Sequence, residues 1–337
     1  MNIAIDCRYI GKSGIGRVCK GIIDNLDYSQ NKYYLIGDKE KLSAYTNAEI
    51  IADDTEPYSK SGLIKFAKDR VNKECDCLII PNFLVPLGIK IPVHTVMHDL
   101  IFLDLKITTK GFVDRFIKKY LLKRCMKKSK SVACVSRFTK SRCEHYYKKL
   151  ADKCYVNYQG LSNELQSCCA EHSAPAPKQN KIVFVGNVKP HKGLKTLLSA
   201  FENCSGLTLK IIGERENFLT GLKLDESMFE NVEFTGRISD AELFEEIRTS
   251  KFLVLPSQYE GFGIPPLEAL CLSTQPIVSD IEVFREVYSG LPVIYFKDTA
   301  ELSGKIMSEP EQIDVFKAVT KRYDYKNFVS GILQHIS

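Results

Sequence analysis

The chain has 337 residues, which is more than one typical domain core accommodates, so two domains are the first expectation. No apolar run reaches the roughly 18 residues that a membrane-spanning helix needs. The net charge of +6 is unevenly placed, because residues 114–153 hold fourteen Lys or Arg and only three acidic residues. This distribution indicates a local basic face and excludes a generally basic protein.

The first residues, Met1–Asp6, enter a strand pattern at once, so we expect no secretory signal and a cytosolic location. The 12 cysteines would stay reduced in that compartment. The close pairs, Cys75 with Cys77 and Cys168 with Cys169, lack the paired spacing of a zinc site. We therefore expect idle thiols, no metal and no bound cofactor.

Short apolar strands alternate with longer helical patterns along the first half of the chain. In chain order, the sequence predicts strands at residues 3–5, 34–36, 77–80, 93–97 and 132–135. Helical patterns fall between them at residues 16–26, 61–73, 112–128 and 138–149. This alternation predicts a parallel, doubly wound sheet.

The pattern breaks at residues 168–180, a polar stretch with two prolines that is typical of a linker. A second run of strands follows at residues 182–185, 207–212, 232–234, 252–255, 275–278 and 293–296, with helices at 193–203, 240–249 and 264–273. The predicted fold class is therefore α/β, with two Rossmann-like domains that face a central cleft. Their expected bounds are 1–165 and 181–324, joined near 166–180. Ligands of such sheets bind beyond the carboxyl ends of the strands.

The most informative segment, residues 256–270, follows a predicted strand and opens a predicted helix. Gly261 and Gly263 allow backbone amides to approach a ligand closely. Pro265 and Pro266 suit a first helical turn, where N–H groups are free in any case. A helix start of this kind binds phosphate through its amides and its dipole.

Two carboxylates, Glu260 and Glu268, lie eight positions apart in this segment, so both can face one ligand. Carboxylates suit sugar hydroxyls because each accepts two hydrogen bonds. The segment resembles the Glu-x7-Glu signature of retaining glycosyltransferases with the GT-B architecture, of the family-four group. The resemblance implies that Glu260 holds the donor sugar and Glu268 the ribose. It also implies donor contacts at Phe262, Gly263, Ile264 and Leu267. A capped helix with acidic decoration is the structural alternative.

Residues 184–193 follow the first strand of the second half and resemble the phosphate-binding loop of the same family. By this resemblance Gly186 opens the loop and Lys192 neutralises the donor diphosphate. Many members carry Arg just after the first Gly, but Asn187 stands there, and Lys189 is the expected substitute. A leaving diphosphate gains negative charge, which a fixed cation stabilises.

Another segment, residues 234–240, also resembles the family. There the loop around Gly236, Arg237 and Ile238 would meet the nucleotide base. Ser239 equally suits a helix N-cap, and the two interpretations are compatible.

The first half has weaker matches. A glycine loop at residues 11–17 resembles the family loop that faces donor phosphate and acceptor, through Gly14 and Gly16. His98 ends a predicted strand and resembles the family histidine near the reacting sugar, although a lone histidine is more often structural. Ser136 and Thr139 resemble a family turn that we interpret as structural. The terminal helix, residues 325–336, matches the helix that crosses back to the first domain.

No Asp-x-Asp occurs in the sequence, so the metal site that many other glycosyltransferases use is missing. The resemblance therefore implies metal-free transfer with retention of configuration, in which a donor phosphate oxygen acts as base. Members that build bacterial envelope polysaccharides make GDP-mannose the favoured donor. UDP-hexoses and dTDP-rhamnose remain open, and the acceptor is a glycan or a lipid-linked glycan.

Three other functions each match part of the sequence. A nicotinamide-dependent dehydrogenase would use the loop at 11–16 and Asp38, but Cys19 takes the last glycine place of Gly-x-Gly-x-x-Gly. A nucleic-acid binder would use the basic stretch but leaves residues 256–270 unexplained, so no nucleic acid is expected as a partner. A sugar-nucleotide epimerase on the same architecture is the nearest enzymatic alternative.

The basic stretch includes a helical pattern at residues 112–128 in which apolar and cationic residues occupy different sides. One interpretation is a helix packed on its sheet with a solvated basic face. The other is docking on anionic lipid, which attracts each nearby Lys or Arg by about 1 kcal/mol. The two are compatible, and together they predict peripheral docking on the inner face of the membrane.

Overall fold

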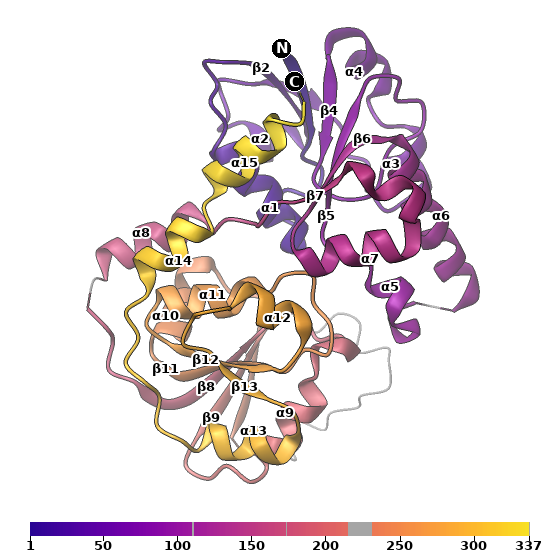
Figure 1. Cartoon of the computed structure of the whole chain (residues 1–337). Helices are drawn as coiled ribbons and strands as arrows, with labels where there is room; N and C mark the ends of the chain where they lie inside the picture. The colour runs from indigo at the N-terminus through magenta and orange to yellow at the C-terminus, as the bar shows by residue number, and fades with distance from the viewer. Residues whose placement is uncertain (110, 173, 215–230, 337) are drawn as a thin grey trace. The chain divides into compact units, whose positions relative to one another are not determined.

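The computed structural model describes every residue except 110, 173, 215–230 and 337, and it divides into two compact units (Figure 1). Unit 1 comprises residues 1–160 and 323–337, and unit 2 comprises residues 161–322. Each unit is a parallel β-sheet with helices packed on it. The α/β class with two Rossmann-like domains is therefore confirmed. The division falls a few residues from the bounds expected at 165 and 325.

The sheet of unit 1 has the strand order β3-β2-β1-β4-β5-β6-β7 among the described residues, all pairs being parallel. Its strands are β1 (Asn2–Asp6), β2 (Lys32–Gly37), β3 (Glu49–Ala52), β4 (Cys77–Ile80), β5 (Val93–Met97), β6 (Ser129–Cys134) and β7 (Cys154–Val156). The five predicted strands of this half are confirmed. The two edge strands, β3 and β7, were not predicted; both are short, with four and three residues.

The helices of unit 1 are α1 (Ser13–Asp24), α2 (Lys39–Leu42), α3 (Lys60–Ile64), α4 (Lys68–Glu74), α5 (Ile101–Asp104), α6 (Phe112–Lys128), α7 (Arg137–Tyr147) and α15 (Tyr325–Leu333), with 3₁₀ turns η1 (Lys106–Thr108) and η2 (Lys148–Lys153). The single helix expected at 61–73 is wrong, because the chain breaks between α3 and α4. At the break Phe66 enters the core, and the Asp53 carboxylate accepts a hydrogen bond from the backbone N–H of Ala67 at 3.0 Å.

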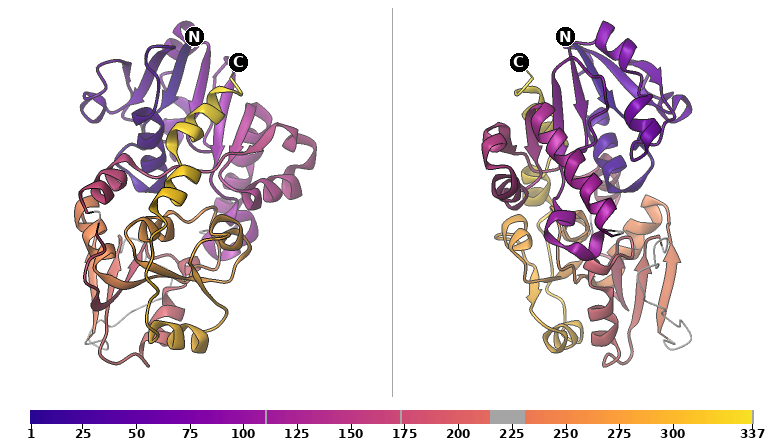
Figure 2. Two further views of the ribbon diagram at one scale, coloured as in Figure 1. Left: turned by 60° about the vertical axis from the view of Figure 1, so that its left-hand side comes forward. Right: turned by 90° about the vertical axis from the view of Figure 1, so that its right-hand side faces the viewer.

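The C-terminal helix α15 packs on unit 1, as the sequence predicted, and both ends of the chain lie on this unit (Figure 2). The Tyr325 ring lies against Gly21 of α1 so closely that any side chain at Gly21 would collide with it. Asn157 donates a hydrogen bond to the carbonyl of Phe328 at 2.9 Å, and the His335 ring stacks on Tyr155. These contacts join the last residues of the chain to the sheet of the first unit.

The sheet of unit 2 has the parallel order β10-β9-β8-β11-β12-β13 among the described residues. Its strands are β8 (Gln179–Val185), β9 (Thr208–Ile212), β10 (Val232–Gly236), β11 (Ser250–Leu255), β12 (Gln275–Ser279) and β13 (Ile294–Phe296). Its helices are α8 (Asn163–Glu171), α9 (Leu194–Phe201), α10 (Asp240–Arg248), α11 (Ile264–Cys271), α12 (Glu282–Val287), α13 (Thr299–Ile306) and α14 (Phe316–Arg322), with the 3₁₀ turn η3 (Pro190–Lys192). All six predicted strands are confirmed.

The stretch 168–180 is only partly the linker that its composition indicated. Its first residues belong to helix α8, which Ser162 caps by accepting a hydrogen bond from the N–H of Leu165 at 3.2 Å. Its last residues already belong to β8, and residue 173 lies outside the described part. The linker expectation failed because a local cap can start a helix even in a polar segment.

Within the described residues, no helix combines the length and the apolar character that crossing a membrane requires.

Candidate donor site

The predicted donor residues of unit 2 gather at the carboxyl edge of its sheet. One loop follows β8 and contains Gly186, Lys189 and Lys192, and a second follows β11 and contains Glu260. The strands β8 and β11 are hydrogen-bonded neighbours in the sheet, although they are far apart in sequence. Parallel strands end at the same edge, so the two loops meet.

The two loops lock together through their backbones. The N–H of Gln258 donates to the carbonyl of His191 at 2.8 Å. Gly193 has a φ of +70°, and a Cβ there would lie 1.9 Å from the carbonyl oxygen of Pro256. A side chain at position 193 would therefore be strained and would push the loops apart.

At this junction the two most important predicted side chains bind each other. The Lys192 ammonium lies 2.6 Å from Oε1 of Glu260, and the Ser257 hydroxyl donates to the same oxygen at 2.7 Å. The side chains of Lys192 and Glu260 are only 20% and 13% exposed. The pair is therefore shielded from water on most sides but remains open to a ligand.

Sequence reasoning missed Ser257 and, at the same junction, His191. His191 is buried, and its Nδ1 has no hydrogen-bond partner among the described residues. Burial, with a smaller contribution from the Lys192 charge, lowers its pKa to about 4, while the charge of Glu260 opposes that shift. The imidazole is thus neutral near pH 7. Its place between Lys189 and Lys192 was visible in the sequence, but its burial was not.

The start of helix α11 has the geometry that the two prolines predicted. Pro265 and Pro266 occupy its first turn, and Gly263 precedes it with a φ of +91°. The hydroxyl of Tyr288 donates to the carbonyl of Gly263 at 2.7 Å, and a Cβ on Gly263 would collide with that hydroxyl. Tyr288 therefore fixes the helix start, where the N–H groups of the residues other than Pro265 and Pro266 favour an anion.

The other predicted residues of this segment lie deeper. Phe262 is buried and Leu267 is completely buried, so any donor contact by these two would come from the backbone. Ile264 is half-buried. Glu268 is only 2% exposed. Glu268 is therefore not a solvent-exposed carboxylate, and a carboxylate in such a position costs free energy unless it is paired or hydrogen-bonded.

The predicted base-binding loop lies at the end of β10. Gly236 closes the strand with a φ of +71°. Arg237 is exposed and forms an ion pair with Glu214 at 3.7 Å, and Ile238 is half-buried. Ser239 forms a capping box with Glu242 at the start of α10, so its predicted role as an N-cap is confirmed.

The remaining residues of the phosphate loop differ in exposure. Gly186 donates its N–H to the carbonyl of Ile212 at 2.9 Å, and its own carbonyl lies 2.2 Å from where a Cβ on Gly213 would be. Lys189 is exposed at the start of η3. It therefore offers a cation that solvent and ligand can reach, unlike the shielded Lys192.

In unit 1 the segment predicted as a glycine loop, residues 11–17, follows β1, but helix α1 already begins at Ser13, so Gly14 and Gly16 lie in the first turns of the helix. Gly16 is required by packing, because a Cβ there would lie 2.2 Å from the carbonyl oxygen of Tyr9. Gly14 is exposed and has no neighbouring atom within 4 Å of such a Cβ, so space beside it is open. Asp38, which a dehydrogenase would use for ribose, instead caps α2 by accepting hydrogen bonds from Glu40 and Lys41.

His98 follows β5 and is held on both sides. Its Nε2 lies 2.8 Å from the carbonyl oxygen of Pro81, which can only accept, so Nε2 carries the proton. Its Nδ1 then accepts from the Gln159 amide at 3.1 Å. Burial lowers the pKa of His98, and the bond to Pro81 and the charge of Asp99 oppose that shift. This ring is suited to orienting a ligand rather than to transferring protons.

One cluster of potential metal ligands occurs among the described residues. The sulfurs of Cys134, Cys143 and Cys154 lie within 4.8 Å of one another, and all three cysteines are buried. They lie in the apolar core of unit 1 and not at the candidate site. The expectation that the reaction needs no metal remains a prediction.

The chain is similar to a known protein family and to several curated proteins. Residues 170–304 match the family described as glycosyl transferases group 1. The chain is 29% identical over 226 residues to O-antigen chain mannosyltransferase RfbU of Salmonella typhimurium, covering 64% of this chain and 62% of that protein. It is 26% identical over 246 residues to the uncharacterized glycosyltransferase MJ1178 of Methanocaldococcus jannaschii, covering 67% and 64%. The chain thus matches less than two thirds of either relative.

The fold of the whole chain is similar to that of solved glycosyltransferases. The Anabaena protein HepE, solved in complex with UDP and glucose, superposes with a TM-score of 0.70 at 14% identity, covering 99% of this chain and 98% of that one. At this identity the likeness establishes the fold alone. It agrees with the parallel sheets of both units.

Proposed function

Because residues 170–304 match the glycosyl transferases group 1 and the whole chain has the fold of solved glycosyltransferases, we propose that it moves a hexose from a nucleotide-sugar donor to a glycan or lipid-linked acceptor, with retention of configuration. The observation that carries the proposal is the shielded pair of Lys192 and Glu260 at the carboxyl edge of the unit 2 sheet. In this pair, a cation that can bind a diphosphate lies beside a carboxylate that can accept hydrogen bonds from sugar hydroxyls.

Each group at the edge has a proposed part in the reaction. Lys192, with the exposed Lys189 and the free N–H groups at the start of α11, stabilises the charge that grows on the leaving diphosphate. Glu260 accepts hydrogen bonds from donor-sugar hydroxyls, and Ser257 keeps its carboxylate in place. A donor phosphate oxygen takes the proton of the attacking acceptor hydroxyl. The loop of Gly236, Arg237 and Ile238 receives the base.

Unit 1 supplies the acceptor side in this proposal. The open space beside Gly14 admits a ligand, and His98 offers a neutral ring whose orientation Pro81 and Gln159 fix. GDP-mannose is the proposed donor, supported by the mannosyltransferase among the relatives, and the process is envelope polysaccharide synthesis. The complex of HepE with UDP keeps uridine donors open. A thermal-shift screen across GDP-, UDP- and dTDP-sugars tests this choice, and stabilisation by a UDP-hexose alone would overturn it.

Replacing Glu268 by alanine is expected to weaken donor binding by about 1.5–3 kcal/mol, because ribose hydroxyls lose a charged acceptor. Titration calorimetry with the donor identified by the screen measures this effect. Glu202→Ala, an exposed substitution at the end of α9, is the matched control and should bind donor normally. An unchanged dissociation constant in a folded Glu268→Ala protein would remove the ribose assignment.

Transfer is expected to persist in excess EDTA, because lysines and a helix start provide the positive field at the proposed diphosphate site. The measurement is the initial rate with and without chelator, at the same ionic strength. A tenfold loss that manganese or magnesium restores would contradict metal-independent transfer.

We further propose that the protein docks on the inner face of the membrane through helix α6. Five large apolar side chains on its first nine residues are exposed, although they lie on a helix of a folded unit. The same helix carries seven Lys or Arg and one Asp. A lipid-linked acceptor would make such docking useful, since its sugar end stays near the bilayer.

A further inference from the structure

The first half of α6 differs from an ordinary surface helix in how much apolar area it leaves open. Phe112, Phe116 and Tyr120 are 84%, 63% and 59% exposed, and Val113 and Ile117 are exposed beside them. The second half of the helix buries Leu121, Leu122, Cys125 and Met126 in the core. Contiguous exposed apolar patches on soluble proteins usually mark an interaction site.

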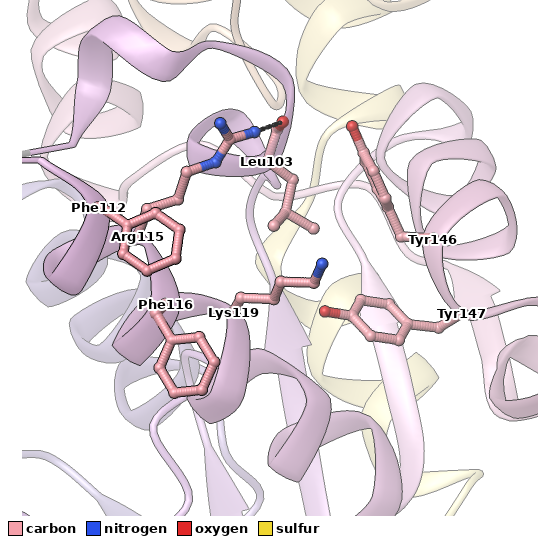
Figure 3. A pocket seen from close by; sticks show the side chains of 7 residues that line it. All are labelled: Leu103, Phe112, Arg115, Phe116, Lys119, Tyr146 and Tyr147. Atoms are coloured by element: carbon pink, nitrogen blue, oxygen red, sulfur yellow. Dashed lines mark hydrogen bonds between the residues drawn. The ribbon is translucent and has the colours of Figure 1, made fainter.

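Beside this patch lies a cavity of about 430 Å³, which belongs entirely to unit 1 (Figure 3). The first half of α6 forms one wall, Leu103 at the end of α5 forms another, and Tyr146 and Tyr147 at the end of α7 face them. Aromatic and aliphatic carbon therefore surrounds most of the space. A cavity of this kind favours a ligand with an apolar portion.

The cavity has few polar groups, and these differ in whether they already have a partner within the protein. Arg115 donates to the carbonyl of Leu103 at 3.0 Å, and the Tyr146 hydroxyl donates to Asp104 at 2.7 Å, so both already have partners. The Tyr147 hydroxyl is buried and has no hydrogen-bond partner among the described residues. Lys119 extends toward it in Figure 3, and no acidic side chain of the described part forms an ion pair with Lys119.

The Tyr147 hydroxyl and the Lys119 ammonium together favour the binding of an anion. A buried hydroxyl without a partner costs free energy, and a phosphate oxygen would satisfy it. Burial raises the pKa of Tyr147 to about 12, so its hydroxyl keeps the proton that it would donate. The ammonium of Lys119 would contribute a charge-assisted hydrogen bond to the same phosphate. Inorganic phosphate would leave the aromatic walls unfilled, whereas an anionic amphiphile matches both parts.

We propose that this cavity receives the phosphate headgroup and the first chain carbons of an anionic membrane lipid, held by Lys119 and Tyr147. The inference rests on the docking of α6 proposed above and gives that docking a specific headgroup contact. Exposed aromatic side chains at the mouth of the cavity enter the interfacial layer, where aromatic rings are favoured. The cations of α6 attract the surrounding anionic lipid.

The chain contains no tryptophan, so a tryptophan introduced by substitution would be the sole source of tryptophan fluorescence. In a Phe112→Trp variant, tryptophan fluorescence is expected to shift to shorter wavelength on titration with phosphatidylcholine vesicles that contain phosphatidylglycerol. Pure phosphatidylcholine vesicles should give little shift. Equal, negligible binding to both vesicle types would overturn the docking and with it the headgroup site.

Three substitutions in that reporter protein separate a headgroup site from general attraction. Lys128→Gln removes the same charge from the far end of α6 and should weaken vesicle binding by about fivefold. Lys119→Gln should weaken it by more than tenfold, since it also removes a direct contact. Tyr147→Phe leaves the charge unchanged and should weaken it by about fivefold. Equal effects of the two lysine variants, with no effect of Tyr147→Phe, would overturn the headgroup site.

Two further measurements keep this inference distinct from the proposed transfer reaction. Added inorganic phosphate, at constant ionic strength, should not displace the protein from vesicles, and displacement would point to a free-phosphate site instead. Donor turnover with water as acceptor should be the same in Tyr147→Phe and wild type. Loss of vesicle binding with normal turnover supports a separate docking site, and loss of both would contradict it.

Discussion

Replacing Lys192 by alanine is expected to lower kcat/KM by about 10²- to 10³-fold, the cost of removing one fixed group that stabilises developing charge. The loss should fall mainly on kcat, because the diphosphate is most negative as it leaves. Steady-state kinetics with the nucleotide sugar chosen by the donor screen give both constants. Lys192→Arg keeps the charge and should recover part of the rate.

The control for this variant lies one turn further along the chain. Lys195 is exposed on α9 and takes no part in the ion pair, so Lys195→Ala should have normal kinetics. Folding of the Lys192 variant is checked by thermal unfolding, because removing Lys192 leaves the shielded Glu260 carboxylate without its cation and is expected to lower stability. Normal turnover by a folded Lys192→Ala protein would refute the diphosphate assignment.

Replacing Glu260 by alanine is expected to lower kcat/KM by about 10²- to 10⁴-fold, because two effects add. The donor sugar loses a charged hydrogen-bond acceptor, at about 1.5–3 kcal/mol. Lys192 also loses the carboxylate that positions it, and residues in contact couple by about 0.5–3 kcal/mol. Glu260→Gln retains hydrogen bonding without the charge and should lie between wild type and Glu260→Ala.

The double variant tests whether the two side chains act as one unit. Because Lys192 and Glu260 are in contact, removing both should cost less than the two separate losses combined. Ser257→Ala, which leaves the ion pair intact but removes one bond to Glu260, should produce a smaller loss than Glu260→Ala. Strict additivity of Lys192→Ala and Glu260→Ala would show that the observed contact has no part in the reaction.

The sequence was sufficient for most of the secondary structure because buried parallel strands are short continuous apolar runs. Inner strands such as β4 and β11 contain such a run, at residues 77–80 and 252–255. The edge strands β3 and β7 were missed because each is short and contains partly exposed residues. Helix α8 was missed since its polar composition outweighed the capping signal at Ser162.

For helix α6 the sequence predicted the correct first and last residues but not which of its side chains are exposed. The sequence predicted residues 112–128, and the structure has the same bounds. A helix of that length spans about 25 Å, whereas the six residues of β6 span about 20 Å. Periodicity alone did not indicate which end lies over the sheet. Only packing decided that Leu121, Leu122, Cys125 and Met126 are buried and that the aromatic end is exposed.

The sequence by itself determined which residues at the donor edge have the right chemistry, through strand-loop-helix patterns that contain Gly, Lys and Glu. Only the tertiary structure decided that Lys192 contacts Glu260 and that His191 is buried beside them. The physical reason is the strand order. The strands β8 and β11 pair in the sheet, so their carboxyl ends bring together two loops that the chain separates by 68 positions. Local sequence patterns do not indicate which strands pair in the sheet.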